Sequence, residues 1–192
     1  MTENIQITDL QLLAQYKQSK NQDDLALLYM RYKGLIFGVC YKYLCNTEAA
    51  NDAIMDIYTE LVPKCLKHDI ENFAPWLHTL ARNHCLMKLR KQKGKNNITL
   101  DESFMQNEAL LHLDDEMENS KQKEATLNAL ENCLDKLDIA QKQSVTLFYL
   151  EDKCYQQIAA ITGLEWNKVR SYIQNGRRNL KICLDKQQNA AK

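Results

Sequence analysis

The chain has 192 residues, and its 25 Lys and Arg balance its 25 Asp and Glu, so the formal net charge is zero. This balance excludes a polycationic nucleic-acid binder, because any affinity for phosphate must come from charge that is gathered locally. A hydrophobic content of 45% supports a packed core, and the low content of turn formers, 5 Gly and 2 Pro, favours long helices over a β-sandwich or barrel. No apolar run is long enough for a transmembrane span and the start lacks a secretory signal pattern, so we expect no membrane insertion.

The first part of the chain, residues 1–95, predicts a helical domain. After a short amphipathic segment, apolar residues recur every three or four positions from Leu25 to Tyr43, which predicts one long helix. Thr47 is suited to cap the next helix, and we expect that helix to end before Pro63. A loop that carries Phe73 should follow, and then a helix with a proline in its first turn.

Charge divides the chain into three segments. Residues 1–95 carry 13 Lys and Arg against 10 Asp and Glu, residues 96–124 carry 2 against 8, and residues 125–192 carry 10 against 7. The net charges are therefore +3, −6 and +3. The acidic middle segment is also the least periodic, so it predicts a linker between two helical domains. Its densest acidic cluster consists of Asp114, Asp115, Glu116 and Glu118. We interpret this cluster as part of a solvated linker rather than as a binding site for a divalent cation.

The last part of the chain predicts four helices. The first follows leucines at helical spacing, and the second covers residues 140–149. The third is short, over residues 155–162, and stops at Gly163, which readily takes the positive φ that ends a helix. The fourth begins near Glu165. A short helix, a turn and a longer amphipathic helix are typical of a helix-turn-helix.

The polar face of the fourth helix is typical of DNA recognition. Residues 166–184 contain five Lys and Arg but no Asp or Glu. Amide, hydroxyl and guanidinium groups are those that pair with base edges and phosphates in the major groove. The alternative is an amphipathic surface helix with a solvated polar face. The candidate DNA-binding residues are Asn167, Lys168, Arg170, Ser171, Gln174, Arg177, Arg178 and Lys181.

The seven cysteines lie one by one in apolar helical patterns, and we interpret them as reduced core residues of a cytoplasmic protein. Cys65 with His68, and His84 with Cys85, resemble half of a zinc site, but no second pair has useful spacing, so we expect no metal. The sequence has no Walker loop, no dinucleotide-binding glycine motif and no supported Ser-His-Asp grouping. These absences predict that the protein is not an enzyme and uses no cofactor.

Residues 154–184 resemble the C-terminal helix-turn-helix of extracytoplasmic-function (ECF) sigma factors, through the pattern Tyr-x-x-Ile-Ala, Gly and Val-Arg-Ser. Residues 49–61, AANDAIMDIYTEL, resemble the Ala-Glu-Asp-x-x-Gln-Glu-x-Phe stretch of sigma domain 2. Residues 73–93 resemble the Trp-Leu-x-x-Ile-Ala-Arg-Asn stretch of the same domain. The resemblance implies an all-α protein with domain 2 over residues 1–95, an acidic linker over 96–124 and domain 4 over 125–192.

The resemblance also implies the partners and the sites. The protein would bind RNA polymerase core through its clamp coiled coil and flap, direct it to promoters and help to open the duplex, and the resemblance allows an anti-sigma factor as a further partner. The residues expected to bind core are Asp52, Met55, Asp56 and Glu60. Those expected at the −10 element and in strand melting are Phe73, Trp76, Arg82, Asn83, Lys88, Arg90 and Lys91. Domain 4 would recognise the −35 element.

Several positions depart from the family pattern. Asn51, Met55 and Met87 stand where the family has Glu, Gln and Asp, and Asn175-Gly176 replaces Arg-Ala. The promoter sequence therefore does not follow from the resemblance. Two alternatives remain at this point: a helix-turn-helix regulator that acts without core polymerase, and a sigma mimic that binds an anti-sigma factor. The domain 2 resemblance argues against the first, and the chain length leaves no room for the receiver domain that such mimics carry.

Overall fold

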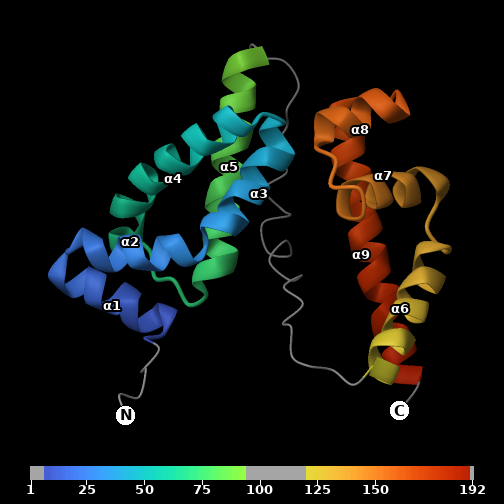
Figure 1. Cartoon of the computed structure of the whole chain (residues 1–192), viewed down its shortest axis with the longest axis horizontal. Coiled ribbons are helices and arrows are strands. Elements are labelled where there is room, and N and C mark those ends of the chain that lie inside the picture. The colour runs from blue at the N-terminus through green and yellow to red at the C-terminus, as the bar shows by residue number, and fades with distance from the viewer. Residues whose placement is uncertain (1–6, 94–119, 191–192) are drawn as a thin grey trace. The chain divides into compact units, whose positions relative to one another are not determined.

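The computed structural model describes residues 7–93 and 120–190, and these residues form nine helices and no strand (Figure 1). The predicted all-α class is confirmed. The chain divides into two compact units, one within residues 1–112 and the other within residues 113–192. Each unit has its own core. Within the described residues, no helix combines the length and the apolar character that crossing a membrane requires.

Unit 1 is a bundle in which α3 packs along both α4 and α5, while α1 packs on α2. Large apolar side chains such as Leu25, Ile57 and Leu77 are fully buried in this bundle. The N-cap of α4 is Asn46 rather than the expected Thr47, because the Asn46 side chain accepts a hydrogen bond from the Ala49 N–H at 2.8 Å. The helices of unit 1 are α1 (Asp9–Ser19), α2 (Gln22–Arg31), α3 (Lys33–Leu44), α4 (Thr47–Lys67) and α5 (Phe73–Lys93).

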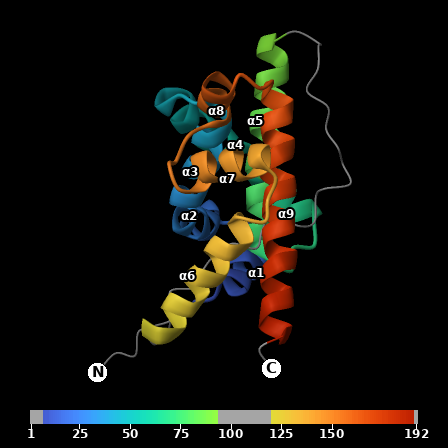
Figure 2. The same ribbon diagram turned by 90° about the vertical axis from the view of Figure 1, so that its right-hand side faces the viewer.

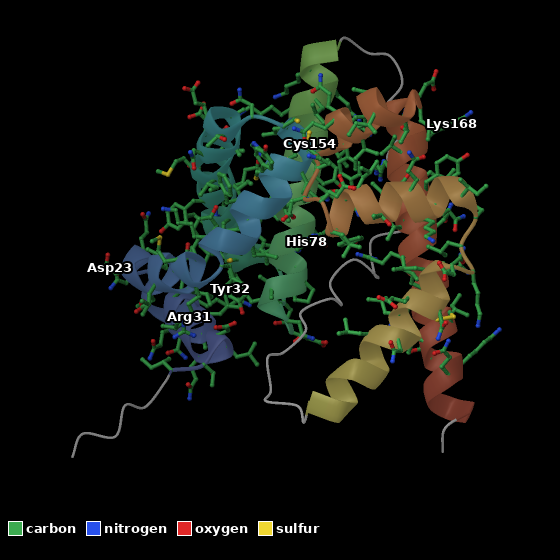
Figure 3. All side chains as sticks on the ribbon, turned by 45° about the vertical axis from the view of Figure 1, so that its right-hand side comes forward. Asp23, Arg31, Tyr32, His78, Cys154 and Lys168 are labelled. Carbon is green, nitrogen blue, oxygen red and sulfur yellow. A yellow bond between two sulfur atoms is a disulfide. The ribbon has the colours of Figure 1, made fainter. Side chains whose placement is uncertain are left out.

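The long helix expected from Leu25 to Tyr43 is wrong, because α2 ends and α3 begins at Tyr32. The Tyr32 hydroxyl donates to the Asp9 carboxylate, and Arg31 donates to the other Asp9 oxygen at 2.8 Å. Figure 3 shows Arg31 and Tyr32 beside α1. Asp9 at the start of α1 therefore fixes the position at which α2 ends and α3 begins. The apolar periodicity of the sequence does not reveal this helix break, because α2 before it and α3 after it both bury their apolar side chains.

The expected end of α4 before Pro63 is also wrong, because α4 continues to Lys67. A proline inside a helix costs one backbone hydrogen bond, but Leu61 and Cys65 on either side of it are completely buried. Burial of these apolar side chains offsets the loss, since a fully buried Leu contributes about 1.5–3 kcal/mol. The connection to α5 is consequently shorter than predicted, and Phe73 lies in the first turn of α5 rather than in a loop.

Unit 2 is organised around α9, which is one long helix with α6, α7 and α8 packed against it (Figure 2). Cys133, Val145 and Leu180 form the centre of its core. Helix α6 begins at Ser120, inside the segment that the sequence assigns to the linker, and residues 94–119 with the acidic cluster lie outside the described residues. The helices of unit 2 are α6 (Ser120–Leu134), α7 (Ile139–Tyr149), α8 (Tyr155–Thr162) and α9 (Trp166–Ala190).

A disulfide joins Cys133 on α6 to Cys183 on α9, with the two Cα atoms 5.8 Å apart. The prediction of reduced core cysteines is therefore wrong for this pair, and it is also wrong for Cys45 and Cys154, which are disulfide-bonded as well. It agrees with the structure for Cys40, Cys65 and Cys85, which are buried thiols. The sequence placed Cys133 and Cys183 on separate apolar helices, but spacing along one helix does not tell which faces of two helices meet. The packing of α6 on α9 brings the two sulfur atoms together.

Candidate functional site

The helix-turn-helix of unit 2 is built from α8, a tight turn and the first part of α9. Gly163 ends α8 with a φ of 69°, a left-handed conformation that glycine takes without strain. Thr162 closes the last turn of α8 by donating its hydroxyl to the Ile158 carbonyl at 2.7 Å. Ile158, Val169 and Ile173 are buried, so the apolar faces of α8 and α9 fix the start of α9. The predicted bounds of α8 and the predicted turn at Gly163 are confirmed.

Helix α9 also approaches α7 very closely, at Gly176. A Cβ atom at this position would lie 2.6 Å from the Val145 Cγ2 and 3.5 Å from the Gln141 Cβ. Only a residue without a side chain fits between the two helices at this distance. Gly176 therefore sets how α7 supports the middle of the recognition helix.

The predicted DNA-binding residues occupy the part of α9 that follows the turn, and their exposure differs. Lys168, Ser171, Arg178 and Lys181 are exposed, and Lys168 is labelled near the start of α9 in Figure 3. Asn167, Gln174 and Arg177 are half-buried. Arg170 is the exception, because it is only 6% exposed. A contact between Arg170 and a base therefore requires its guanidinium group to leave its present surroundings.

The residues predicted at the −10 element lie along α5, but they do not share one exposed face. Phe73 is 3% exposed and its ring packs on Tyr32, with the centroids 5.6 Å apart, so a contact between Phe73 and DNA requires the ring to leave the core. Arg82 is 1% exposed. The others are half-buried or exposed, and are Trp76, Asn83, Lys88, Arg90 and Lys91.

The predicted core-binding residues lie on the outer side of α4. Asp52 and Asp56 are exposed, and Met55 is 68% exposed between them, whereas Ile54 and Ile57 on the inner side are buried. A large apolar side chain flanked by carboxylates is the composition of a protein-binding patch rather than of a DNA-binding one, because carboxylates repel phosphates.

A network of charged side chains joins α4 to α5 beside this patch. The His84 Nδ1 lies 2.7 Å from the Glu60 Oε1, and the His84 Nε2 lies 3.7 Å from the Asp56 Oδ2. Lys88 reaches the same Asp56 oxygen at 3.6 Å, and Lys64 donates to the Glu60 Oε2 at 2.8 Å. Burial by itself raises the pKa of Glu60, but hydrogen bonds from Lys64 and His84 outweigh it and lower that pKa.

Sequence reasoning missed this network because it treated His84 only as half of a metal site. Within the described residues, no group of three or more His, Cys, Asp or Glu is placed to hold a metal ion. The signal that was available is the four-residue spacing of Asp56 with Glu60 and of His84 with Lys88, which puts each pair on one face of its helix.

Comparison with known protein families agrees with this two-unit architecture. The family model for sigma-70 region 2 matches residues 28–95, which include α3, α4 and α5. The family model for sigma-70 region 4 matches residues 127–180, which include the helix-turn-helix. The chain belongs to the ECF group of the sigma-70 family. Sigma factors of this family bind RNA polymerase core and promoter DNA and direct transcription initiation, and they are not enzymes.

Individual sigma factors are similar to this chain over most of its length. The ECF RNA polymerase sigma factor SigK of Mycobacterium sp. (strain JLS) is 23% identical over 179 residues, which cover 92% of this chain and 91% of SigK. SigW of Bacillus subtilis (strain 168) is 23% identical over 182 residues, which cover 90% of this chain and 96% of SigW. A solved structure described as CnrH in complex with the cytosolic domain of CnrY is 18% identical, covers 93% of this chain and 97% of its own, and has a TM-score of 0.40.

Proposed function

We propose that this sigma factor reads the −35 element with α9, and binds core polymerase and the −10 element with unit 1. The observation that carries the proposal is the separation of charge between the two candidate surfaces. Helix α9 has basic and amide side chains and no acidic residue from residue 166 to residue 184. The outer side of α4 presents Asp52 and Asp56 around an exposed methionine. The first surface suits phosphate and base edges, and the second suits a protein partner.

Within α9, we divide the contacts by their position along the helix. Residues near the start of a recognition helix reach base edges, and later basic residues hold phosphates. We therefore assign Arg170 and Gln174 to bases, and Arg177, Arg178 and Lys181 to phosphates. Asn167, Lys168 and Ser171 lie at the start of the same face and complete it. A bidentate base contact contributes about 1–3 kcal/mol of discrimination, whereas a phosphate contact adds affinity that is blind to sequence and depends on salt.

In unit 1, the residues of α5 would capture the −10 element and the opened strand. Trp76 offers an aromatic face on which an unstacked base can rest, and such stacking contributes about 1–3 kcal/mol per base. Arg90 and Lys91 follow on the same helix and supply positive charge that would attract the phosphates of the DNA strand. Arg82, Asn83 and Lys88 complete the predicted set, and a DNA contact by the buried Arg82 requires its side chain to move.

The polymerase partner of α4 would be the clamp coiled coil, with Asp52, Met55, Asp56 and Glu60 on the contact side. Unit 2 would bind the flap of the polymerase. An anti-sigma factor would compete with the polymerase for these two contact surfaces of the protein. We also propose that the protein works in the cytoplasm, because its two main partners, core polymerase and promoter DNA, are there.

The experiment for the core-binding surface is a pull-down of purified core polymerase with the double variant Asp52→Arg and Asp56→Arg. Both side chains are exposed, so we expect the helical content to be unchanged and core binding to be lost. The matched control is Asp23→Arg with Glu71→Arg, which makes the same charge change at other exposed positions of unit 1. If the folded Asp52 and Asp56 variant retains core as well as the control does, this surface is wrong.

A further inference from the structure

His84 occupies an unusual place for a histidine beside a protein-binding patch. Its side chain is 13% exposed, and it lies between the carboxylates of Glu60 and Asp56 on the facing helix. A carboxylate only accepts hydrogen bonds, so the 2.7 Å contact with Glu60 requires the hydrogen to be on Nδ1. The Nε2 side of the ring then faces Asp56 at 3.7 Å, which is longer than a hydrogen bond.

The two carboxylates are not equivalent in this arrangement. Both oxygens of Glu60 are engaged, Oε1 with His84 and Oε2 with Lys64, and its side chain is 35% exposed. Asp56 meets His84 and Lys88 with its Oδ2 atom, at 3.7 and 3.6 Å, and its side chain is 57% exposed. Glu60 is therefore fixed by contacts to both of its carboxylate oxygens. Asp56 is contacted by His84 and Lys88 through one oxygen, and the rest of its carboxylate faces solvent.

The order of the charges along the two helices supports the same distinction. Lys64, Glu60 and Asp56 follow one another at four-residue steps on α4, and His84 and Lys88 lie one turn apart on α5. His84 is thus the link between the anchored carboxylate and the exposed one. The charged groups around it are those of Asp56, Glu60 and Lys64 on α4 and of Lys88 on its own helix.

We propose that His84 is a positioning residue for polymerase core binding: anchored on Glu60, it fixes the orientation in which Asp56 meets the core. The proposal rests on the proposed core-binding role of α4. It gives Glu60 a further part on this surface, because Glu60 holds the ring of His84 in place. An aspartate side chain that is already ordered loses less conformational freedom on binding, and this advantage corresponds to roughly two- to tenfold in affinity.

The test is a pair of double-mutant cycles on the full chain, with the affinity for purified core polymerase as the measurement. We expect His84→Leu to weaken core binding roughly two- to tenfold in the wild-type background. In the Asp56→Asn background, His84→Leu should have almost no further effect, because the carboxylate that it orients is gone. In the Asp52→Asn background, its effect should stay the same as in the wild type, since Asp52 is outside the network.

Two further variants keep the test independent of folding. His84→Asn retains an amide donor close to the position of Nδ1 and should recover most of the affinity, whereas His84→Leu does not. A general loss of structure would instead weaken binding equally in both aspartate backgrounds, and that result overturns the proposal. If neither Asp52→Asn nor Asp56→Asn changes the affinity, the proposed core-binding surface itself is wrong. If Asp56→Asn matters but is additive with His84→Leu, only the positioning role is wrong.

Discussion

Gly176 is the position where a single added carbon should have the clearest effect on the stability of unit 2. In Gly176→Ala, the new Cβ would lie 2.6 Å from the Val145 Cγ2, so one of the two atoms must move. Val145 is buried, and a β-branched side chain inside a helix has essentially one favourable χ1 rotamer. The valine cannot rotate away cheaply, and α7 and α9 must separate instead.

The size of the effect follows from two opposing contributions. Alanine is more favourable than glycine inside a helix by about 1 kcal/mol. Overpacking in a well-packed core costs about 1–3 kcal/mol. We therefore expect Gly176→Ala to lower the free energy of unfolding of unit 2 by up to about 2 kcal/mol in the wild-type background. In the Val145→Ala background the contacted methyl is absent, and the same substitution should raise that free energy by about 1 kcal/mol.

Urea unfolding of the full chain measures this change of sign. The chain has two tryptophans, Trp76 in unit 1 and Trp166 in unit 2, so a Trp76→Phe background makes the fluorescence report on unit 2. The four variants at positions 145 and 176 then form a double-mutant cycle. The reasoning is refuted if Gly176→Ala stabilises unit 2 as much in the presence of Val145 as in its absence.

Three other predictions concern DNA affinity, the disulfide and acid stability. Lys181→Ala should weaken binding of the holoenzyme about equally on all promoters and reduce the slope of log affinity against log salt by about one. The matched control is Lys186→Ala, on another side of α9, which should change that slope less. Equal slopes for the two variants would contradict the assignment of Lys181 to a phosphate. Reduction of the Cys133–Cys183 disulfide should lower the free energy of unfolding of unit 2 by about 2–4 kcal/mol, because the two cysteines are 50 residues apart. Cys154 is also disulfide-bonded, so the measurement is the difference between wild type and Cys183→Ser, and Cys183→Ser should lose less stability on reduction than the wild type does. The lowered pKa of Glu60 contributes stability that is present above its unfolded pKa, near 4.5, and is lost as the pH falls through the lower folded pKa. The difference in stability between the wild type and Glu60→Gln, followed through Trp76, should therefore shrink only in acid; a difference that is independent of pH argues against the ionised pair.

Local signals in the sequence predicted the elements that depend on local physics. The bounds of α8 and the turn at Gly163 follow from a short apolar helix and a residue that tolerates positive φ. The helix break at Tyr32 and the continuation of α4 through Pro63 do not follow from local signals, because each depends on packing against residues far along the chain. Asp9 holds the break, and the buried face of α4 carries the helix past its proline.

The same division applies to the candidate sites. Helical spacing placed the residues of α9 on one face, but it did not reveal that Arg170 is buried while Lys168 is exposed. It also did not reveal the contact of His84 with Glu60, since this contact joins two helices whose packing is a property of the fold. The disulfide between α6 and α9 has the same origin.

Transcription reconstituted from purified core polymerase and this protein, on a library of promoters with randomised upstream sequence, tests the central claim most directly. We predict transcripts from defined start sites only when the protein is present, and a preferred upstream sequence among the templates that are transcribed. Gln174→Ala should relax that preference at one or two positions while transcription continues. Transcription that selects the same upstream sequence with wild type and with Gln174→Ala would contradict base reading by this residue, and no transcription above core alone would contradict the account as a whole.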